Sequence, residues 1–374
     1  MKKILLVIAI SISLLSKVAF AKEEYPNLTG QVLFESRNDR ILSSKQGGIP
    51  KNNVLFNIEP DFSLNFSDNW SVKTGWRIFP IERRQYDSPE RSSKVRPEFF
   101  SQNRGVNIDS SGLIVEELKI HFENEDMKLF AGKYNPTFAT MYRRSKRVGL
   151  FVSDFAEEYE LREKIGLGVS ALLEDSEITL NGFFDDTTGL SSSALKNRKS
   201  QDPDANIAGN TSTLSSYSVT IEGEKLFGVR DLFYNFGYRS LGVEKNLQIK
   251  RETAYTANIE YLKKIGQYTS VIPLVELVKI NNFTGRENRD AEYLTTSLII
   301  KYSGWTTSLA SVFRNIDNNY TTAERSKSRD NLLQFSIGYK FTNNIAVDVS
   351  RARLKEDGNK GDLIGIIISY LYKF

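Results

Sequence analysis

The stretch that decides the fold is DLIGIIISYLYKF, residues 362–374. Read at a period of two, one face of this stretch carries large apolar and aromatic side chains: Ile364, Ile366, Ile368, Tyr370, Tyr372 and Phe374. Gly365, Ser369 and Lys373 fall on the opposite face. An apolar face that ends in aromatic residues is typical of a strand in contact with lipid. Because an open strand edge would leave unpaired N–H and C=O groups in lipid, we expect the sheet to close, with this strand beside the first.

The first 21 residues have the pattern of a secretory signal peptide. Lys2 and Lys3 supply positive charge, residues 4–16 carry no charge, and residues 19–21 (Ala-Phe-Ala) form a small-x-small cleavage site. The uncharged core is shorter than the ~20 residues that a membrane-spanning helix needs. We therefore expect cleavage after Ala21 and export of residues 22–374.

The composition excludes several classes of function. The chain has 50 Lys+Arg and 46 Asp+Glu, but three of the lysines lie in the signal peptide, so the exported chain is almost neutral. Together with export, this near neutrality argues against a nucleic-acid partner. With no cysteine, neither disulfides nor thiolate metal sites can form. Aromatic residues make up 11% of the chain, which suits a membrane protein whose apolar residues occupy alternate positions.

From residue 27 onward the chain repeats a strand, a polar connection, a returning strand and a tight turn. In residues 53–66 the alternation is clear, with Val54, Phe56 and Ile58 on the opposite face from Asn57 and Glu59. Pro60 removes one donor from the ladder and predicts a local bulge. We predict sixteen strands, at residues 27–37, 53–66, 70–81, 112–123, 127–135, 164–173, 177–185, 215–224, 231–241, 252–263, 268–280, 291–302, 305–316, 331–341, 345–355 and 362–374.

Short and long connections alternate between these strands, which indicates the fold class. The pattern predicts an all-β protein, a transmembrane antiparallel up-and-down β-barrel of 16 strands, with short periplasmic turns and long extracellular loops. Residues 22–374 then form one domain. A soluble all-β protein would also alternate polar and apolar residues. It would not need aromatic residues at the strand ends, such as Phe66, Trp70, Tyr302, Trp305 and Phe341.

The phase of each strand assigns its charged side chains to one face. A Lys or Arg on the lipid face at mid-depth costs about 2 to 4 kcal/mol, whereas a charge in a water-filled lumen costs little. We therefore expect one set of charges to line the lumen: Glu59, Asp61, Lys73, Arg77, Glu117 and Lys119. Arg351 and Arg353 follow Val347 and Val349 in the lipid-facing phase. We expect either a bulge that shifts them or contact with lipid headgroups.

With its signal peptide, sixteen strands and terminal Tyr370-x-Tyr372-x-Phe374, the chain resembles a Gram-negative outer-membrane porin. Residues 131–136 (AGKYNP) are similar to the segment that leads into the third loop of various proteobacterial porins. The resemblance implies a homotrimer in the outer membrane, surrounded by membrane lipid and lipopolysaccharide. It also implies that the barrel-assembly machinery reads Phe374 as an assembly signal.

In general porins the third extracellular loop folds into the lumen, and residues 136–163 occupy that position here. Their charges are segregated, with Arg143, Arg144, Lys146 and Arg147 followed by Asp154, Glu157, Glu158 and Glu160. Opposite charges on two walls of a narrow passage would set up a transverse field. The family's acidic-Pro-Glu-Phe-Gly-Gly signature is absent. Two alternatives remain: the two halves pair with each other, or the loop stays outside and binds lipopolysaccharide phosphates.

The function we predict is a passive channel for small hydrophilic solutes and ions, narrowed by residues 136–163. A substrate-specific channel is the first alternative, and a lumen lined by a run of aromatic residues would favour it. A barrel enzyme or a surface structural or adhesive barrel is the second. The chain's single histidine, His121, lies on the polar face of its strand, where it is more often a wall residue than a general base. We expect no catalytic residue, metal or cofactor.

Overall fold

The computed structural model describes residues 25–45, 47, 51–80, 111–142, 148–194, 206–245, 247–318, 326–356 and 358–374. Within these residues the strands are β1 (Asn27–Ser44), β2 (Asn52–Asn65), β3 (Trp70–Pro80), β4 (Ser111–Glu123), β5 (Met127–Tyr134), β6 (Lys164–Leu173), β7 (Ser176–Asp185), β8 (Ser216–Gly223), β9 (Leu232–Leu241), β10 (Glu252–Tyr261), β11 (Lys263–Ile265), β12 (Thr269–Asn281), β13 (Arg289–Tyr302), β14 (Trp305–Asn318), β15 (Ser326–Lys340), β16 (Ile345–Glu356) and β17 (Asn359–Lys373). The short helices are α3 (Val152–Ala156), η3 (Glu157–Tyr159), η4 (Gly189–Ser191), η5 (Leu226–Gly228) and η6 (Phe283–Gly285).

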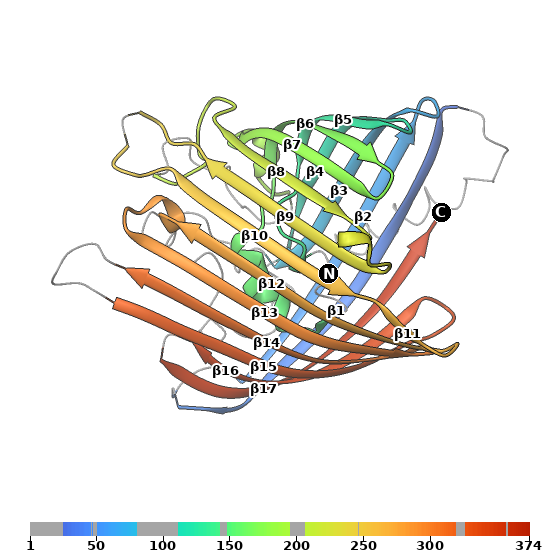
Figure 1. Cartoon of the computed structure of the whole chain (residues 1–374), viewed down its shortest axis with the longest axis vertical. Helices are drawn as coiled ribbons and strands as arrows, with labels where there is room; N and C mark the ends of the chain where they lie inside the picture. Colours follow the sequence, from blue (N-terminus) through green and yellow to red (C-terminus); the bar gives the residue numbers. More distant parts are fainter. Residues whose placement is uncertain are drawn as a thin grey trace.

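The strands form one closed antiparallel sheet (Figure 1). Each strand pairs with its neighbours in sequence, and β1 pairs with both β2 and β17, which closes the barrel. Because β10 and β11 both pair with β12 and are separated by one residue, they count as one spanning strand. The described residues therefore form the barrel of 16 strands that the alternation predicts. At the seam, the N–H of Gly30 donates to Phe374 O at 3.0 Å, and the N–H of Phe374 donates to Gly30 O at 3.1 Å.

The outer face of the barrel is apolar along most of its strands. On β17, Ile364, Ile366 and Ile368 are exposed, while Leu363 between β1 and β16 is fully buried on the inner side. The other strands carry exposed Leu, Ile, Phe and Tyr side chains in the same phase. Among the described helices, none combines the length and apolar character needed to cross a membrane.

Several strand ends differ from the prediction. The first strand runs to Ser44 rather than Arg37, so residues 38–44 of the predicted first connection belong to the strand. Its polar residues alternate, because Asp39 and Ile41 point inward and are buried while Asn38 and Arg40 point outward. β15 and β17 likewise begin earlier than expected. At these strand ends polar residues occupy both faces, so the sequence shows no alternation of polar and apolar residues there.

The prediction of a bulge at Pro60 is wrong. A bulge elsewhere changes the phase of β4. Pro60 pairs with Val32 in an unbroken β1–β2 register. The register shift lies instead between β3 and β4, where Gly75 pairs with Glu117 but Trp76 pairs with Val115. The extra residue turns the first half of β4 over. Strict alternation with Leu118 and Ile120 would put Ile114 on the outer face, but Ile114 is 1% exposed on the inside.

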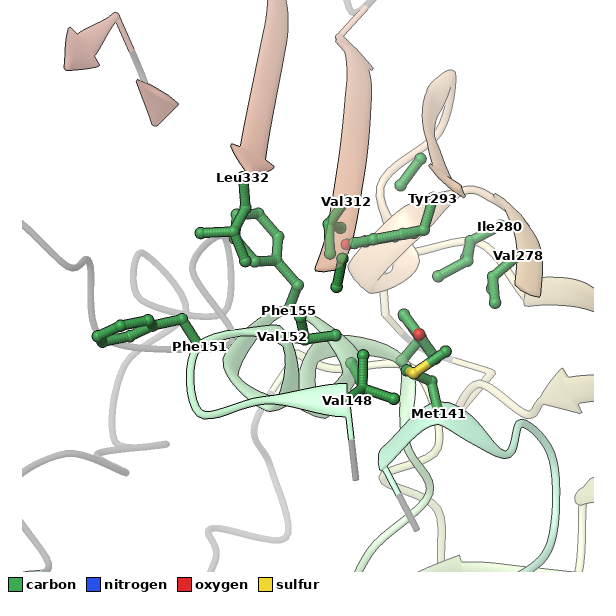
Figure 2. Close-up of a cluster of buried hydrophobic side chains, with 14 of the residues drawn as sticks. Met141, Val148, Phe151, Val152, Phe155, Val278, Ile280, Tyr293, Val312 and Leu332 are labelled. Atoms are coloured by element: carbon green, nitrogen blue, oxygen red, sulfur yellow. The ribbon is translucent and has the colours of Figure 1, made fainter. Parts of the chain in front are cut away.

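The inside of the barrel is not polar throughout. Residues of the connection between β5 and β6 form an apolar cluster with inward side chains of β12–β17, and Figure 2 shows part of it. Val278, Val312 and Leu332 supply the wall side of this cluster, and Met141 and Phe155 supply the loop side. On these strands a polar and apolar alternation does not identify the inward face, because the inward side chains contact the loop instead of water.

Candidate pore and its internal loop

The described parts of the connection between β5 and β6, residues 135–142 and 148–163, lie inside the barrel. Its helix α3 is the green helix within the wall of strands in Figure 1. In the described parts of this loop, residues 135–142 and 148–163, contacts reach inward side chains from β1, β4, β9 and β12–β16. The loop thus runs from its own side of the barrel to the opposite wall.

The first anchor of the loop is Glu276 on β12. One carboxylate oxygen accepts the N–H of Thr140 at 2.9 Å, its hydroxyl at 2.9 Å, and the N–H of Met141 at 3.0 Å. The other oxygen accepts the hydroxyl of Tyr159 at 2.8 Å. Glu276 is 1% exposed, so these four donors take the place of water around its carboxylate.

The second anchor is Arg314 on β14. Its guanidinium donates to Asp330 from Nε at 2.9 Å and from a terminal nitrogen at 2.5 Å, and to Glu158 of the loop at 2.5 Å. Tyr293 donates its hydroxyl to the second oxygen of Glu158 at 2.6 Å. The guanidinium also lies over the ring of Phe155, 5.3 Å from its centroid. A buried, multiply paired arginine of this kind fixes the loop in one position.

Further contacts hold the loop to the wall on β1 and β15. Gln334 accepts the N–H of Phe151 at 2.7 Å. On β1, Arg37 donates to both oxygens of Asp154, at 3.2 and 3.0 Å. The ring of Phe151 lies below the same guanidinium, 5.4 Å away.

Close to β3 and β4, the end of the loop forms a network of charges. Arg162 pairs with Glu157 at 2.7 Å and with Glu116 of β4. Arg77 of β3 bridges the same Glu116 at 3.1 Å to Glu59 of β2 at 2.5 Å. The network joins the loop to β2–β4, the wall on which the strand phases predict the lumenal charges.

Glu160 lies beside this network with one buried carboxylate oxygen that no described donor reaches. Burial raises the pKa of the Glu160 carboxyl to about 8. Arg162 lowers this pKa, whereas Glu157 raises it again. Glu160 is therefore largely protonated at neutral pH.

The wall residues expected in the lumen all lie on the inner phase of β2–β4. Glu117 pairs with Lys119 at 2.7 Å, and Asp61 accepts a hydrogen bond from Gln31 at 3.1 Å. A cavity of about 450 Å³ runs along this wall; its lining includes Gln31, Asp61, Lys73, Glu117 and Lys373. The structure thus brings Glu59, Asp61, Lys73, Arg77, Glu117 and Lys119 together on one side of the interior.

The charges expected in the loop have different outcomes. Arg143, Arg144, Lys146 and Arg147 lie outside the described residues. Three of the four acids expected in the loop are each bound by an arginine: Asp154 by Arg37, Glu157 by Arg162 and Glu158 by Arg314. These acids hold the loop in place rather than form a bare acidic wall.

Sequence reasoning missed Glu116, Arg162, Glu276 and Arg314, which position the loop. The bulge concealed Glu116, because strict alternation places it on the lipid face. On β14, inward Arg314 lies between inward Val312 and Ile316, so neither face of that strand reads as polar. Arg239 could have been found, because it alternates with the outward aromatic residues of β9; it donates to Glu252 at 2.6 Å and to Tyr159 O at 2.5 Å.

Comparison with known proteins supports the fold. Neither a protein-family model nor a curated protein matches the sequence. Among solved structures, the chain is similar to a loop-deletion mutant of OmpT, an outer membrane protein of Vibrio cholerae, with a TM-score of 0.53 and 10% identity over 92% of this chain and 98% of that chain. It is also similar to OccAB3 of Acinetobacter baumannii (TM-score 0.53, 9% identity, 93% and 100% covered) and OccK8 of Pseudomonas aeruginosa (TM-score 0.52, 8% identity, 93% and 98% covered).

Proposed function

We propose that this chain is an outer-membrane channel through which small hydrophilic solutes and ions diffuse down their gradients. The observation that carries the proposal is a closed sheet of 16 strands with an apolar outer face. A closed sheet leaves no strand edge unpaired in lipid. A barrel of this size is too wide for its own side chains to fill, so it encloses space for water. The fold shared with the bacterial outer-membrane proteins supports this reading.

The internal loop, described over residues 135–142 and 148–163, narrows the proposed channel. It packs on the wall from β12 to β16 through the apolar cluster, Glu276 and Arg314. The passage then runs beside β1–β4, where the polar wall carries Asp61, Lys73 and Glu117. Size selection follows from the loop, and ion preference from the charges along that wall.

The surroundings of the barrel belong to the same proposal. A cleaved signal peptide over residues 1–21 would export the chain, but these residues lie outside the described part of the structure. The barrel-assembly machinery would read Phe374, whose backbone completes the seam with Gly30. Lipid and lipopolysaccharide would surround the apolar outer face, and the resemblance to porins supports a homotrimer.

Liposome swelling with uncharged sugars of increasing size tests the channel. We expect swelling rates that fall smoothly with solute size, because a passive pore discriminates by dimension. Liposomes that contain the folded barrel and swell no faster than empty liposomes would contradict the proposal.

A substrate-specific channel is the second candidate, and the extent of the internal loop favours it. A loop with a buried apolar core fills more of the lumen than a thin constriction would. OpdK of Pseudomonas aeruginosa, similar in fold with a TM-score of 0.50 and 8% identity, has been crystallised with vanillate. In the swelling assay, one chemical class of solute entering much faster than others of equal size would identify such a channel.

A further inference from the structure

The outer face of the barrel carries a group of cations near the end where the internal loop begins. Six exposed basic side chains form this outer basic patch: Arg40 on β1, Lys327 and Arg329 on β15, Arg351 and Arg353 on β16, and Lys360 on β17. These strands are neighbours in the barrel, as Figure 1 shows. The patch residues alternate with buried inward residues, such as Ala352, so they point away from the lumen.

The register places these cations directly beside the apolar belt. Arg351 pairs across the sheet with Phe335 on one side and Ile364 on the other. Both apolar side chains are exposed, at 50% and 38%. Arg353 pairs with Leu333, which is 53% exposed, and Arg40 lies opposite Ile364 from the β1 side. The β16 register is unbroken, so no bulge moves either arginine inward.

Protein carboxylates neutralise only part of the patch. Arg353 pairs with Asp362 at 3.3 Å, and Lys327 pairs with Asp317 of β14 at 3.0 Å. Arg40, Arg329, Arg351 and Lys360 form no ion pair with a described residue. On β12 and β13, by contrast, outward Lys279 is matched by Glu292 at 3.1 Å. Among the described residues, the β15–β1 side therefore carries four cations without a protein counter-ion.

Cations at the margin of a lipid-facing surface attract anions that lie at the same depth. Placing an arginine on the lipid face costs little near the interface but about 2 to 4 kcal/mol at the midplane. Its planar guanidinium matches the oxygens of a phosphate group in a bidentate arrangement. Exposed Leu333, Phe335 and Ile364 next to the cations offer a surface for acyl chains. One ligand class satisfies both surfaces, namely a lipid whose headgroup carries phosphate.

We propose that the outer basic patch binds the phosphate groups of an anionic membrane lipid whose acyl chains lie along β15–β17. This inference rests on the proposed membrane location but not on conduction. A barrel that retains lipid but carries no current would contradict the proposed channel function and leave the lipid site standing. A conducting barrel with no lipid preference would contradict only the lipid site.

Native mass spectrometry of the full-length folded barrel in detergent tests the site by counting retained lipids. The probes are a bisphosphorylated glycolipid, phosphatidylglycerol, phosphatidylcholine and inorganic phosphate. The test variant is Arg329→Gln/Arg351→Gln. The matched control, Lys263→Gln/Lys264→Gln, removes two exposed cations on β11 at the opposite end of the barrel. Heat-modifiable migration on gels establishes that each variant is folded.

We expect the wild-type barrel to retain an anionic lipid in preference to phosphatidylcholine, and the patch variant to bind that lipid about tenfold more weakly. The β11 control should bind as the wild type does. Preference for the glycolipid over phosphatidylglycerol would identify the source of the phosphate as a phosphorylated glycolipid, and the reverse preference would identify a phospholipid. Equal weakening in both variants, no weakening in the patch variant, or inorganic phosphate bound as tightly as the lipid would overturn the proposal.

Discussion

At the scale of single residues, the position of the internal loop depends on a few buried polar side chains. Glu276 accepts hydrogen bonds from Thr140, Met141 and Tyr159. Glu276→Ala would leave these donors unsatisfied, and each hydrogen bond to a charged group is worth roughly 1.5–3 kcal/mol. We predict that the loop loosens, so that single-channel conductance rises and the open-channel noise increases.

Two further variants separate the loss of the Glu276 hydrogen bonds from the general effect of removing a negative charge. Glu276→Gln keeps the shape and one acceptor, so its conductance should lie between those of the wild type and the alanine variant. Glu292→Gln removes an outward carboxylate on the neighbouring strand and should leave the current unchanged. Wild-type conductance in Glu276→Ala would show that this contact does not hold the loop.

Glu160 would give the proposed channel a specific pH dependence. Burial raises its pKa from the ordinary 4.5 to about 8, so the carboxyl is neutral at pH 7 and ionises as the pH rises through 8. Its charged neighbours Glu157 and Glu116 both pair with Arg162. We predict that permeability to cations relative to anions increases between about pH 7 and 9, as measured by reversal potentials in a salt gradient.

The control for Glu160 is Glu244, a carboxylate in the connection between β9 and β10. A hydrogen bond from the N–H of Ser212 holds the pKa of Glu244 below its usual range, so Glu244 stays ionised over the same interval. Glu244→Gln should keep the wild-type pH profile, whereas Glu160→Gln should flatten it. A Glu160→Gln profile that matches the wild type would assign the titration to other groups.

At the scale of elements, the loop and the wall behave as a small hydrophobic core. Phe155 is 1% exposed and packs in the apolar cluster with Leu332. Replacing a buried phenylalanine with alanine costs about 3–5 kcal/mol. We predict that Phe155→Ala speeds hydrogen exchange across residues 148–163 while the barrel stays folded. Phe313→Ala, which removes an outward ring on β14, should leave that exchange slow, and equal protection in both variants would contradict this packing.

The seam between β1 and β17 depends on a glycine. A Cβ at Gly30 would lie 2.5 Å from Asp61 O and 2.8 Å from the ring of Phe374, whereas a Cβ at Gly182 on β7 would meet nothing within 4 Å. We predict that Gly30→Ala lowers the yield of heat-modifiable folded barrel and that Gly182→Ala does not. Similar yields would show that the seam accommodates a side chain.

The same elements explain which features the sequence could predict. Strands with lipid on one side and the polar wall of the lumen on the other, such as β2, show a clear alternation, because each face has one kind of neighbour. β14 lacks this contrast, since Val312 and Ile316 face the loop instead of water. The bulge beside Glu116 depends on pairing across two strands, which no local pattern reveals. The barrel could therefore be predicted from the sequence, whereas the residues that anchor the loop could be found only from three-dimensional contacts.

At the scale of the whole molecule, the interior has two unlike sides. The loop and its apolar cluster occupy the side formed by β12–β17, while β2–β4 present a charged wall and a cavity of about 450 Å³. In the proposed channel, solutes would diffuse along the second side. We propose that this route is open from one end of the barrel to the other.

Planar-bilayer recording of the refolded chain tests whether the route is open. We expect discrete, ohmic current steps when single barrels insert, and larger steps when Glu276→Ala releases the loop. A barrel that migrates as folded and inserts into the bilayer yet carries no ionic current would contradict it.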